Sequence, residues 1–104
     1  MNKYADWRCN VAMNEKSSMH EFRSGAGKFL KHKANIVVWT DGGCRNHDRS
    51  TGWVVLAVGH FGAKKLTRIL PQGATYLVGT SSSLSIEILA AVEALQTVCR
   101  MIDA

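Results

Sequence analysis

Our prediction of the fold begins with the stretch Ile36-Val37-Val38-Trp39-Thr40-Asp41-Gly42-Gly43-Cys44. Residues 36–40 are all β-branched or aromatic, which favours a buried strand. The glycine pair predicts the end of that strand and a turn of the backbone. Because side chains alternate along a strand, Asp41 shares a face with Trp39 at the strand end, where a carboxylate can face a cleft. The alternative is that Asp41 is a turn residue, since Asp-Gly is a common turn pair.

Length and composition limit the chain to one small domain. Its 104 residues are 46% hydrophobic, which is enough for a single core. No apolar run is long enough to span a membrane, and the first residues lack the apolar segment of a secretory signal. The three cysteines are far apart and odd in number, and the four histidines lack metal-ligand spacing. We therefore expect a cytoplasmic protein with no membrane partner, no disulfide framework and no zinc site.

The positive charge is concentrated at the N-terminus. Residues 1–34 carry seven Lys/Arg and three Asp/Glu, whereas residues 35–104 carry six and five. Residues 1–34 also show no sustained period of 2 or 3.6, so we expect a mobile or loosely helical basic arm. Its aromatic residues lie among cations, a pattern that can stack on bases and neutralise phosphates of nucleic acid. The alternative is a solubilising tail.

The rest of the chain predicts an α+β fold. Residues 53–58 and 65–70 are two further strands around a hairpin turn at residues 60–63, and Pro71-Gln72-Gly73 is expected to end the last strand. A helix is predicted from the hydroxyl run through Glu87 to about Arg100, with Ser82 or Ser83 as its N-cap. The residues expected to pack on the sheet form one apolar stripe: Ile88, Val92, Leu95, Cys99 and Ile102.

The order of these motifs resembles the N-terminal part of the type 1 ribonuclease H family. Thr40-Asp41-Gly42-Gly43-Cys44 matches the family's Thr-Asp-Gly-x-Cys motif, which carries its first catalytic aspartate at the end of the first strand. Gly52-Trp53 matches the Gly-aromatic pair that opens the second strand. Glu87 precedes Ile-Leu-Ala-Ala-Val-Glu-Ala-Leu and matches the catalytic glutamate of the family's helix. The resemblance covers about residues 35–104.

This resemblance implies two-metal hydrolysis of the RNA strand of RNA–DNA hybrids. Asp41 and Glu87 would be catalytic, and the metal site would consist of Asp41, Gly42 and Glu87, binding Mg²⁺ or alternatively Mn²⁺. The residues that would contact nucleic acid are Gly43, Cys44, Arg45, Asn46 and Ser83. Contacts to 2′-hydroxyl groups would distinguish RNA from DNA. From the helix alone, Glu87 can also be explained as a carboxylate favoured by the positive helix N-terminus.

The chain departs from the family in three places. Residues 46–52 replace the family's Gly/Pro-rich loop, and Ser83-Leu84 stand where the family has amides that touch the hybrid. The family's third carboxylate ends a fourth strand after the helix, and Asp103 follows the helix too closely to take that role. The expected fold is therefore a truncated ribonuclease H-like α+β domain at residues 35–104: a three-stranded antiparallel sheet with one packed helix, preceded by the arm at 1–34. A second chain could supply the missing half at the open sheet edge. Alternatives to an incomplete nuclease are a non-catalytic nucleic-acid-binding or protein-interaction fragment and an inactive gene remnant.

Overall fold

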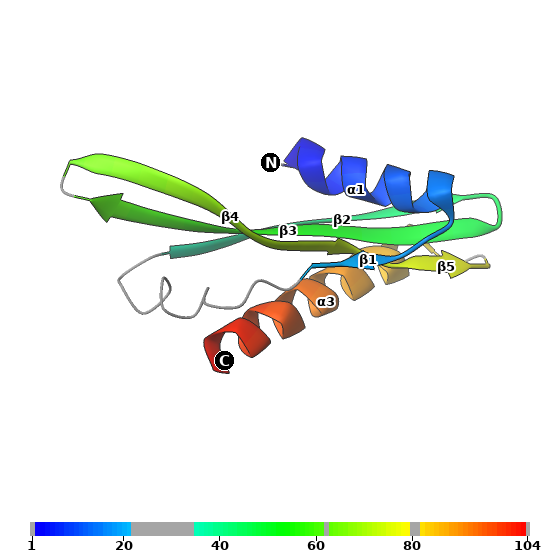
Figure 1. The fold of residues 1–104 in the computed structure, drawn as a ribbon. Coiled ribbons are helices and arrows are strands. Elements are labelled where there is room, and N and C mark those ends of the chain that lie inside the picture. The colour runs from blue at the N-terminus through cyan, green and yellow to red at the C-terminus, as the bar shows by residue number, and fades with distance from the viewer. Residues whose placement is uncertain (1, 22–34, 62, 80–81, 104) are drawn as a thin grey trace.

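A computed structural model of the protein describes residues 2–21, 35–61, 63–79 and 82–103 (Figure 1). The elements occur in the order α1 (Asn2–Glu15), β1 (Met19–His20), β2 (Asn35–Arg45), β3 (Asp48–Phe61), β4 (Lys64–Ala74), β5 (Tyr76–Val78) and α3 (Ser83–Asp103). The fold is α+β, as the sequence predicts. No helix in the described ranges is long and apolar enough to cross a membrane.

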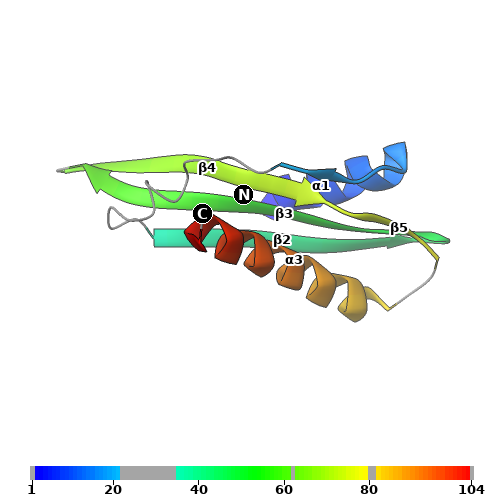
Figure 2. The ribbon, with the colours of Figure 1, turned by 60° about the horizontal axis from the view of Figure 1, so that its bottom comes forward.

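All strand pairs of the sheet are antiparallel. The order is β1-β4-β3-β2, and β5 also pairs with β3. The described residues thus form five strands and two helices. The prediction of three strands and one helix missed two strands and one helix. The two helices lie on opposite faces of the sheet, α1 on one and α3 on the other (Figures 1 and 2). The central strand β3 is buried on both faces at Trp53, Val54, Val55 and Leu56.

The β2–β3 hairpin differs from the prediction at its glycines. Strand β2 does not end at Gly42-Gly43 but continues to Arg45, which pairs with Asp48 across a turn at residues 46–47. A Cβ at Gly42 would lie 2.8 Å from the backbone nitrogen of Glu87 in α3, and one at Gly43 would lie 2.7 Å from the Met13 side chain in α1. The glycines therefore serve close helix packing on both faces of the strand rather than a turn.

Strand β4 also extends further than predicted. It runs through Pro71 to Ala74, and its register with β3 shifts between Val54 and Leu56, where β4 has one extra residue. Proline has no N–H to donate to a neighbouring strand, and a bulge tolerates that loss. Pro71 therefore interrupts the register without ending the strand.

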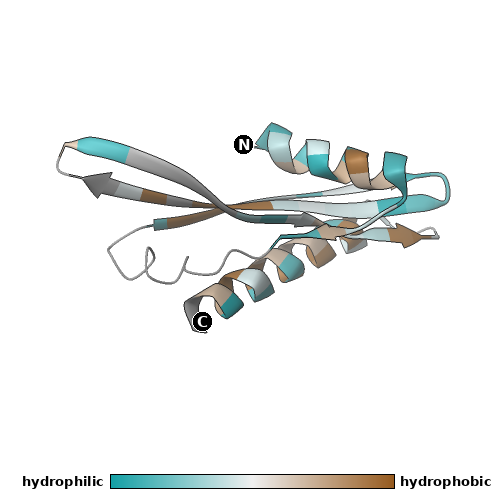
Figure 3. Cartoon of the chain, viewed as in Figure 1, coloured by the Kyte–Doolittle hydropathy of each residue, from teal (hydrophilic) through white to brown (hydrophobic). Residues whose placement is uncertain are grey.

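Helix α1 corrects the prediction of a flexible arm for residues 2–21. Its buried residues are Ala5, Cys9, Ala12 and Met13, which recur at helical spacing. Most of them are small and are separated by polar residues, so the hydropathy of the segment gives no strong period (Figure 3). This helix packs directly on Gly52 of β3, where a Cβ would lie 2.2 Å from the Ala5 carbonyl oxygen. A glycine at this position is therefore needed for the close packing. The remainder of the predicted arm, residues 22–34, lies outside the described residues.

Helix α3 begins as predicted, but a different face packs on the sheet. The Ser82 hydroxyl accepts a hydrogen bond from the Ser85 N–H at 3.2 Å, which confirms Ser82 as the N-cap. The buried face consists of Ile86, Ala90, Ala94 and Met101. Ile88, Val92 and Leu95 of the predicted stripe are exposed by 43–59%, and Cys99 is exposed as well. At Gly42 the absence of a side chain on β2 leaves room for Ile86, and further along the helix the alanines Ala90 and Ala94 face the sheet.

The main hydrophobic core lies between the sheet and α3. Trp53 and Val55 of β3 pack there with Ala94 and Met101 of α3. A polar anchor lies beside this core: the Glu93 carboxylate accepts hydrogen bonds from the Thr51 hydroxyl at 2.5 Å and the Thr75 hydroxyl at 2.6 Å. Because Thr51 is fully buried, these bonds fix the rotation of α3 on the sheet.

Candidate functional site

Asp41 lies in β2 on the face that α1 covers. It pairs across the hairpin with Gly52, the glycine that receives α1. One Asp41 carboxylate oxygen accepts a hydrogen bond from the Gly42 N–H at 3.0 Å, and the Asp41 carbonyl accepts one from the Cys9 thiol at 3.2 Å. Asp41 is thus held within a strand and beneath a helix, which makes it a fixed carboxylate rather than a turn residue.

Helix α1 brings a second carboxylate, Asp6, to Asp41. Partial burial raises the pKa of Asp41, and a hydrogen bond between the side chains of Asp6 and Asp41 raises it further. The negative charges of Asp6 and Glu87 act in the same direction, whereas the hydrogen bond from the Gly42 N–H lowers the pKa. The three carboxylates therefore interact around Asp41, within β2.

Glu87 reaches this region from the opposite face of the sheet. Its backbone nitrogen lies against Gly42, the neighbour of Asp41, and its side chain is exposed in the first turns of α3. The two acids that the sequence selects, Asp41 and Glu87, are thus close enough for their charges to interact. They come from strand β2 and helix α3, which are in contact.

The donor chemistry of these residues fits Mg²⁺, which prefers carboxylate oxygens. Across the residues that the structure describes, however, no three His, Cys, Asp or Glu side chains form a group that could hold a metal ion. The cause lies in the layers of the fold: Asp6 and Asp41 share a hydrogen bond on the α1 face, while Glu87 belongs to the helix on the other face. The pair Asp41 and Glu87 remains the candidate for ligands, with Asp6 as a neighbour.

The residues predicted to contact nucleic acid are spread along the hairpin and the start of α3. Gly43 is covered by Met13 of α1, while Cys44, Asn46 and Ser83 are exposed. Asn46 occupies the hairpin turn with a positive φ of 45°, a conformation that Asn adopts more readily than most residues. These exposed residues lie at the same end of the molecule as Asp41. Their contacts to nucleic acid stay a prediction.

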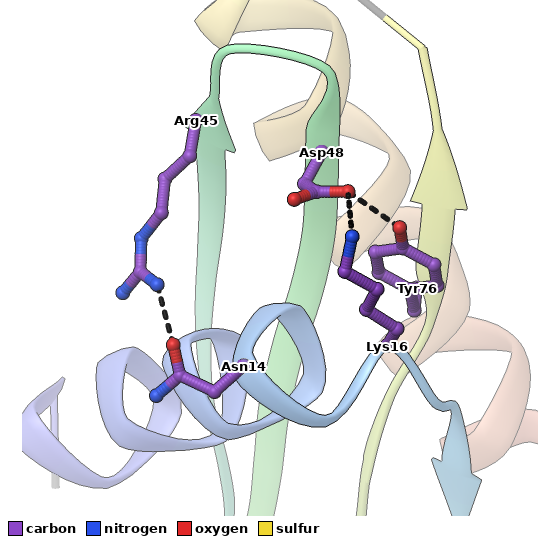
Figure 4. A network of polar contacts seen from close by, with 5 residues as sticks. All are labelled: Asn14, Lys16, Arg45, Asp48 and Tyr76. Carbon is purple, nitrogen blue, oxygen red and sulfur yellow. Dashed lines mark hydrogen bonds and ion pairs between the residues drawn. The ribbon is translucent and has the colours of Figure 1, made fainter.

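Arg45 is held by α1 rather than left free in solution. Its guanidinium donates to the side-chain oxygens of Asn10 and Asn14, each at 2.6 Å. Just beyond α1, Lys16 forms an ion pair at 3.9 Å with Asp48, which also accepts a hydrogen bond from the Tyr76 hydroxyl (Figure 4). That bond is the main reason why the pKa of Tyr76 is raised. These contacts hold α1 over the turn end of the hairpin.

Two features of α1 bear on function, and only the second was visible in the sequence. Asp6 carried no signal by itself, because it stands among polar residues with no strand or glycine beside it. The helical spacing of small residues from Ala5 to Met13 is the only signal that could have placed Asp6 over the sheet. The second feature is a cluster on the outer surface, where the Arg8 guanidinium lies 4.5 Å from the Trp7 ring centre and Tyr4 packs edge-on against Trp7. Trp7 is 48% exposed.

Comparison of the chain with family models, with curated proteins and with solved structures finds no match.

Proposed function

We propose that the chain belongs to a ribonuclease H-class enzyme that hydrolyses the RNA strand of RNA–DNA hybrids. The single observation that carries the proposal is the meeting of three carboxylates from three elements around Asp41, within β2. Burial is the largest cause of the raised pKa of Asp41, and the hydrogen bond to Asp6 and the charges of Asp6 and Glu87 raise it further. Perturbed carboxylates grouped together are typical of phosphoryl-transfer and hydrolytic sites.

The roles of the residues follow from their positions. Asp41 and Glu87 would hold Mg²⁺ or Mn²⁺, and Gly42 lets the backbone of Glu87 approach β2. When bound, the ions would supply an activated water and stabilise the leaving oxygen. The side-chain hydrogen bond with Asp6 raises the pKa of Asp41, so Asp6 would influence how much negative charge Asp41 presents. Cys44, Asn46 and Ser83 are exposed near this point and would contact the sugar-phosphate backbone, together with Gly43 and Arg45.

The test of this proposal is metal binding followed by cleavage. Mg²⁺ titration should shift the backbone NMR signals of residues 41–43 and 86–88, and Asp41→Asn should remove these shifts. The matched control is Asp48→Asn, which changes another half-buried acid of the same hairpin away from Glu87. In Mg²⁺ the chain should cleave a labelled hybrid slowly or not at all, because a site with so few carboxylates positions the ions poorly. A second chain that supplies further carboxylates should raise the rate.

The proposal fails if Mg²⁺ shifts signals scattered over the surface and spares both groups of residues. It also fails if a second chain restores cleavage and the restored rate is the same for Asp41→Asn as for Asp48→Asn. Slow cleavage by itself does not count against it, since we expect the isolated chain to be a poor enzyme.

A non-catalytic nucleic-acid-binding fragment is the second candidate, and the outer surface of α1 favours it. Trp7 is half exposed and is stacked by Arg8, and aromatic rings beside cations bind bases and phosphates without sequence preference. Trp7→Ala should weaken binding of a single-stranded oligonucleotide by about tenfold, because one stacked base contributes on this scale. Val78→Ala is the control, since Val78 is an exposed apolar residue in β5. Equal affinities of the two variants would exclude this surface.

A further inference from the structure

The outward side of α3 is apolar, although its inward side already forms the core. Leu84, Ile88, Val92 and Leu95 lie three and four residues apart and are exposed by 66, 55, 43 and 59%. In Figure 3, tan and brown segments recur along α3 between teal and white ones. A helix that is apolar on both sides is normally buried on both sides. We call these four residues the α3 stripe.

The α3 stripe leans towards the open edge of the sheet. Ile36 and Val38 of β2 and Val98 of α3 all pack against the core cluster, whereas Glu93 bonds to Thr51 of β3. At 100° per residue, Leu84, Ile88 and Leu95 lie about 140–180° around the helix from Glu93, and Val92 lies about 100° from it. Strand β2, in turn, has one partner strand, β3, within the described part of the sheet. Strand β2 is the outer strand of the sheet on the side where α3 lies (Figure 2), so the open hydrogen-bonding edge is next to the helix that carries the stripe.

We propose that this side binds a second copy of the chain, with β2 pairing antiparallel to β2 of the copy and the two α3 stripes packing together. A two-fold axis normal to the sheet would extend it with the antiparallel pairing it already has. Both α3 helices would then lie on the same face. Because α3 contacts β2 and β3 and strands are about 4.8 Å apart, the two helices would be about 10 Å apart, a normal helix-packing distance.

Charge and size both favour a second copy as the occupant. The α3 stripe contains no charged residue, so two copies meet without like charges in contact. With the axis near Ala91, the two Glu87 residues would be about 12 Å apart along the helices. The stripe offers roughly 350 Å² of apolar surface per copy, below the roughly 800 Å² per partner of a standard interface. Pairing along the 11 residues of β2 is therefore needed as well, and it supplies the direction and register that an apolar stripe lacks.

Sedimentation equilibrium of the full chain tests this proposal. The mass should rise from 11.4 kDa towards twice that value across the micromolar range. Leu95→Glu should raise the dissociation constant at least tenfold, while Gln96→Glu, which adds the same charge at the next exposed position, should not. Because each copy carries a net charge of +5, added salt should strengthen the dimer, the opposite of its effect on nucleic-acid binding.

A disulfide experiment tests the geometry independently of affinity. With Cys44 and Cys99 replaced by serine, Ala91→Cys should form a dimer under mild oxidation, because residue 91 lies at the axis. The control is Ser85→Cys, an exposed position of α3 away from the axis, which should remain monomeric. The proposal is overturned if the native chain stays a monomer at 500 μM, a concentration on the order of the dissociation constant of a very weak complex. It is also overturned if the Leu95 and Gln96 variants dimerise equally, or if Ala91→Cys gives no more disulfide than Ser85→Cys.

Discussion

The substitution Gly52→Ala tests whether α1 is an integral part of the fold. A Cβ at position 52 would lie 2.2 Å from the Ala5 carbonyl oxygen and 2.8 Å from the Cys9 nitrogen. Both are backbone atoms of a helix, so no side chain can rotate away. To restore an ordinary contact of 3.4 Å, α1 must move outward by about 1.2 Å. Overpacking of this kind costs about 1–3 kcal/mol, and we expect the upper half of that range because the whole helix must shift.

Urea denaturation, followed by far-UV circular dichroism, measures this loss. The control is Gly59→Ala in the same strand, where a Cβ would meet nothing within 4 Å. That variant should stay within about 0.5 kcal/mol of the native protein, or gain slightly through the reduced freedom of the unfolded chain. For a small domain, a loss of about 2–3 kcal/mol is a large part of the total stability. If Gly52→Ala and Gly59→Ala unfold at the same urea concentration, α1 does not pack as described and Asp6 does not lie beside Asp41.

Three further predictions follow from individual contacts. Glu93→Ala should destabilise the fold by about 1–3 kcal/mol, because two threonine hydroxyls lose their acceptor. The control Gln96→Ala should have little effect, and the urea midpoints of unfolding of the two variants measure the difference. The folded state raises the pKa of Asp41, so its stabilising contribution is present below the unfolded pKa and is lost as the pH rises through the folded one. Asp41→Asn should therefore be more stable than the native protein at pH 7 and about equal to it near pH 3, and equal midpoints at pH 7 would contradict this. Burial raises the pKa of the Cys9 thiol to about 12, so iodoacetamide should modify exposed Cys99 in the native protein and reach Cys9 only in urea, as mass spectrometry of the peptides would show.

The sequence alone predicted the features that depend on local chemistry. The β-branched run before Asp41 is a strand, the apolar run at Trp53–Leu56 is the central strand, and Ser82 caps the helix that carries Glu87. Each depends on propensity, alternation or a hydrogen bond within a few residues, so neighbours along the chain are sufficient.

Tertiary packing decided the other features of the fold. Which helix face packs on the sheet depends on which surfaces fit together rather than on which are most hydrophobic. Gly42 and Gly43 looked like a turn, but they are the positions where helices approach β2 from its two faces. Helix α3 has two apolar sides, and the one with Ile86, Ala90, Ala94 and Met101 packs on the sheet, with Ile86 in the space that Gly42 leaves open. The same close fit at Gly52 places α1 on the other face and brings Asp6 to Asp41, two acids 35 residues apart whose meeting no local pattern could predict.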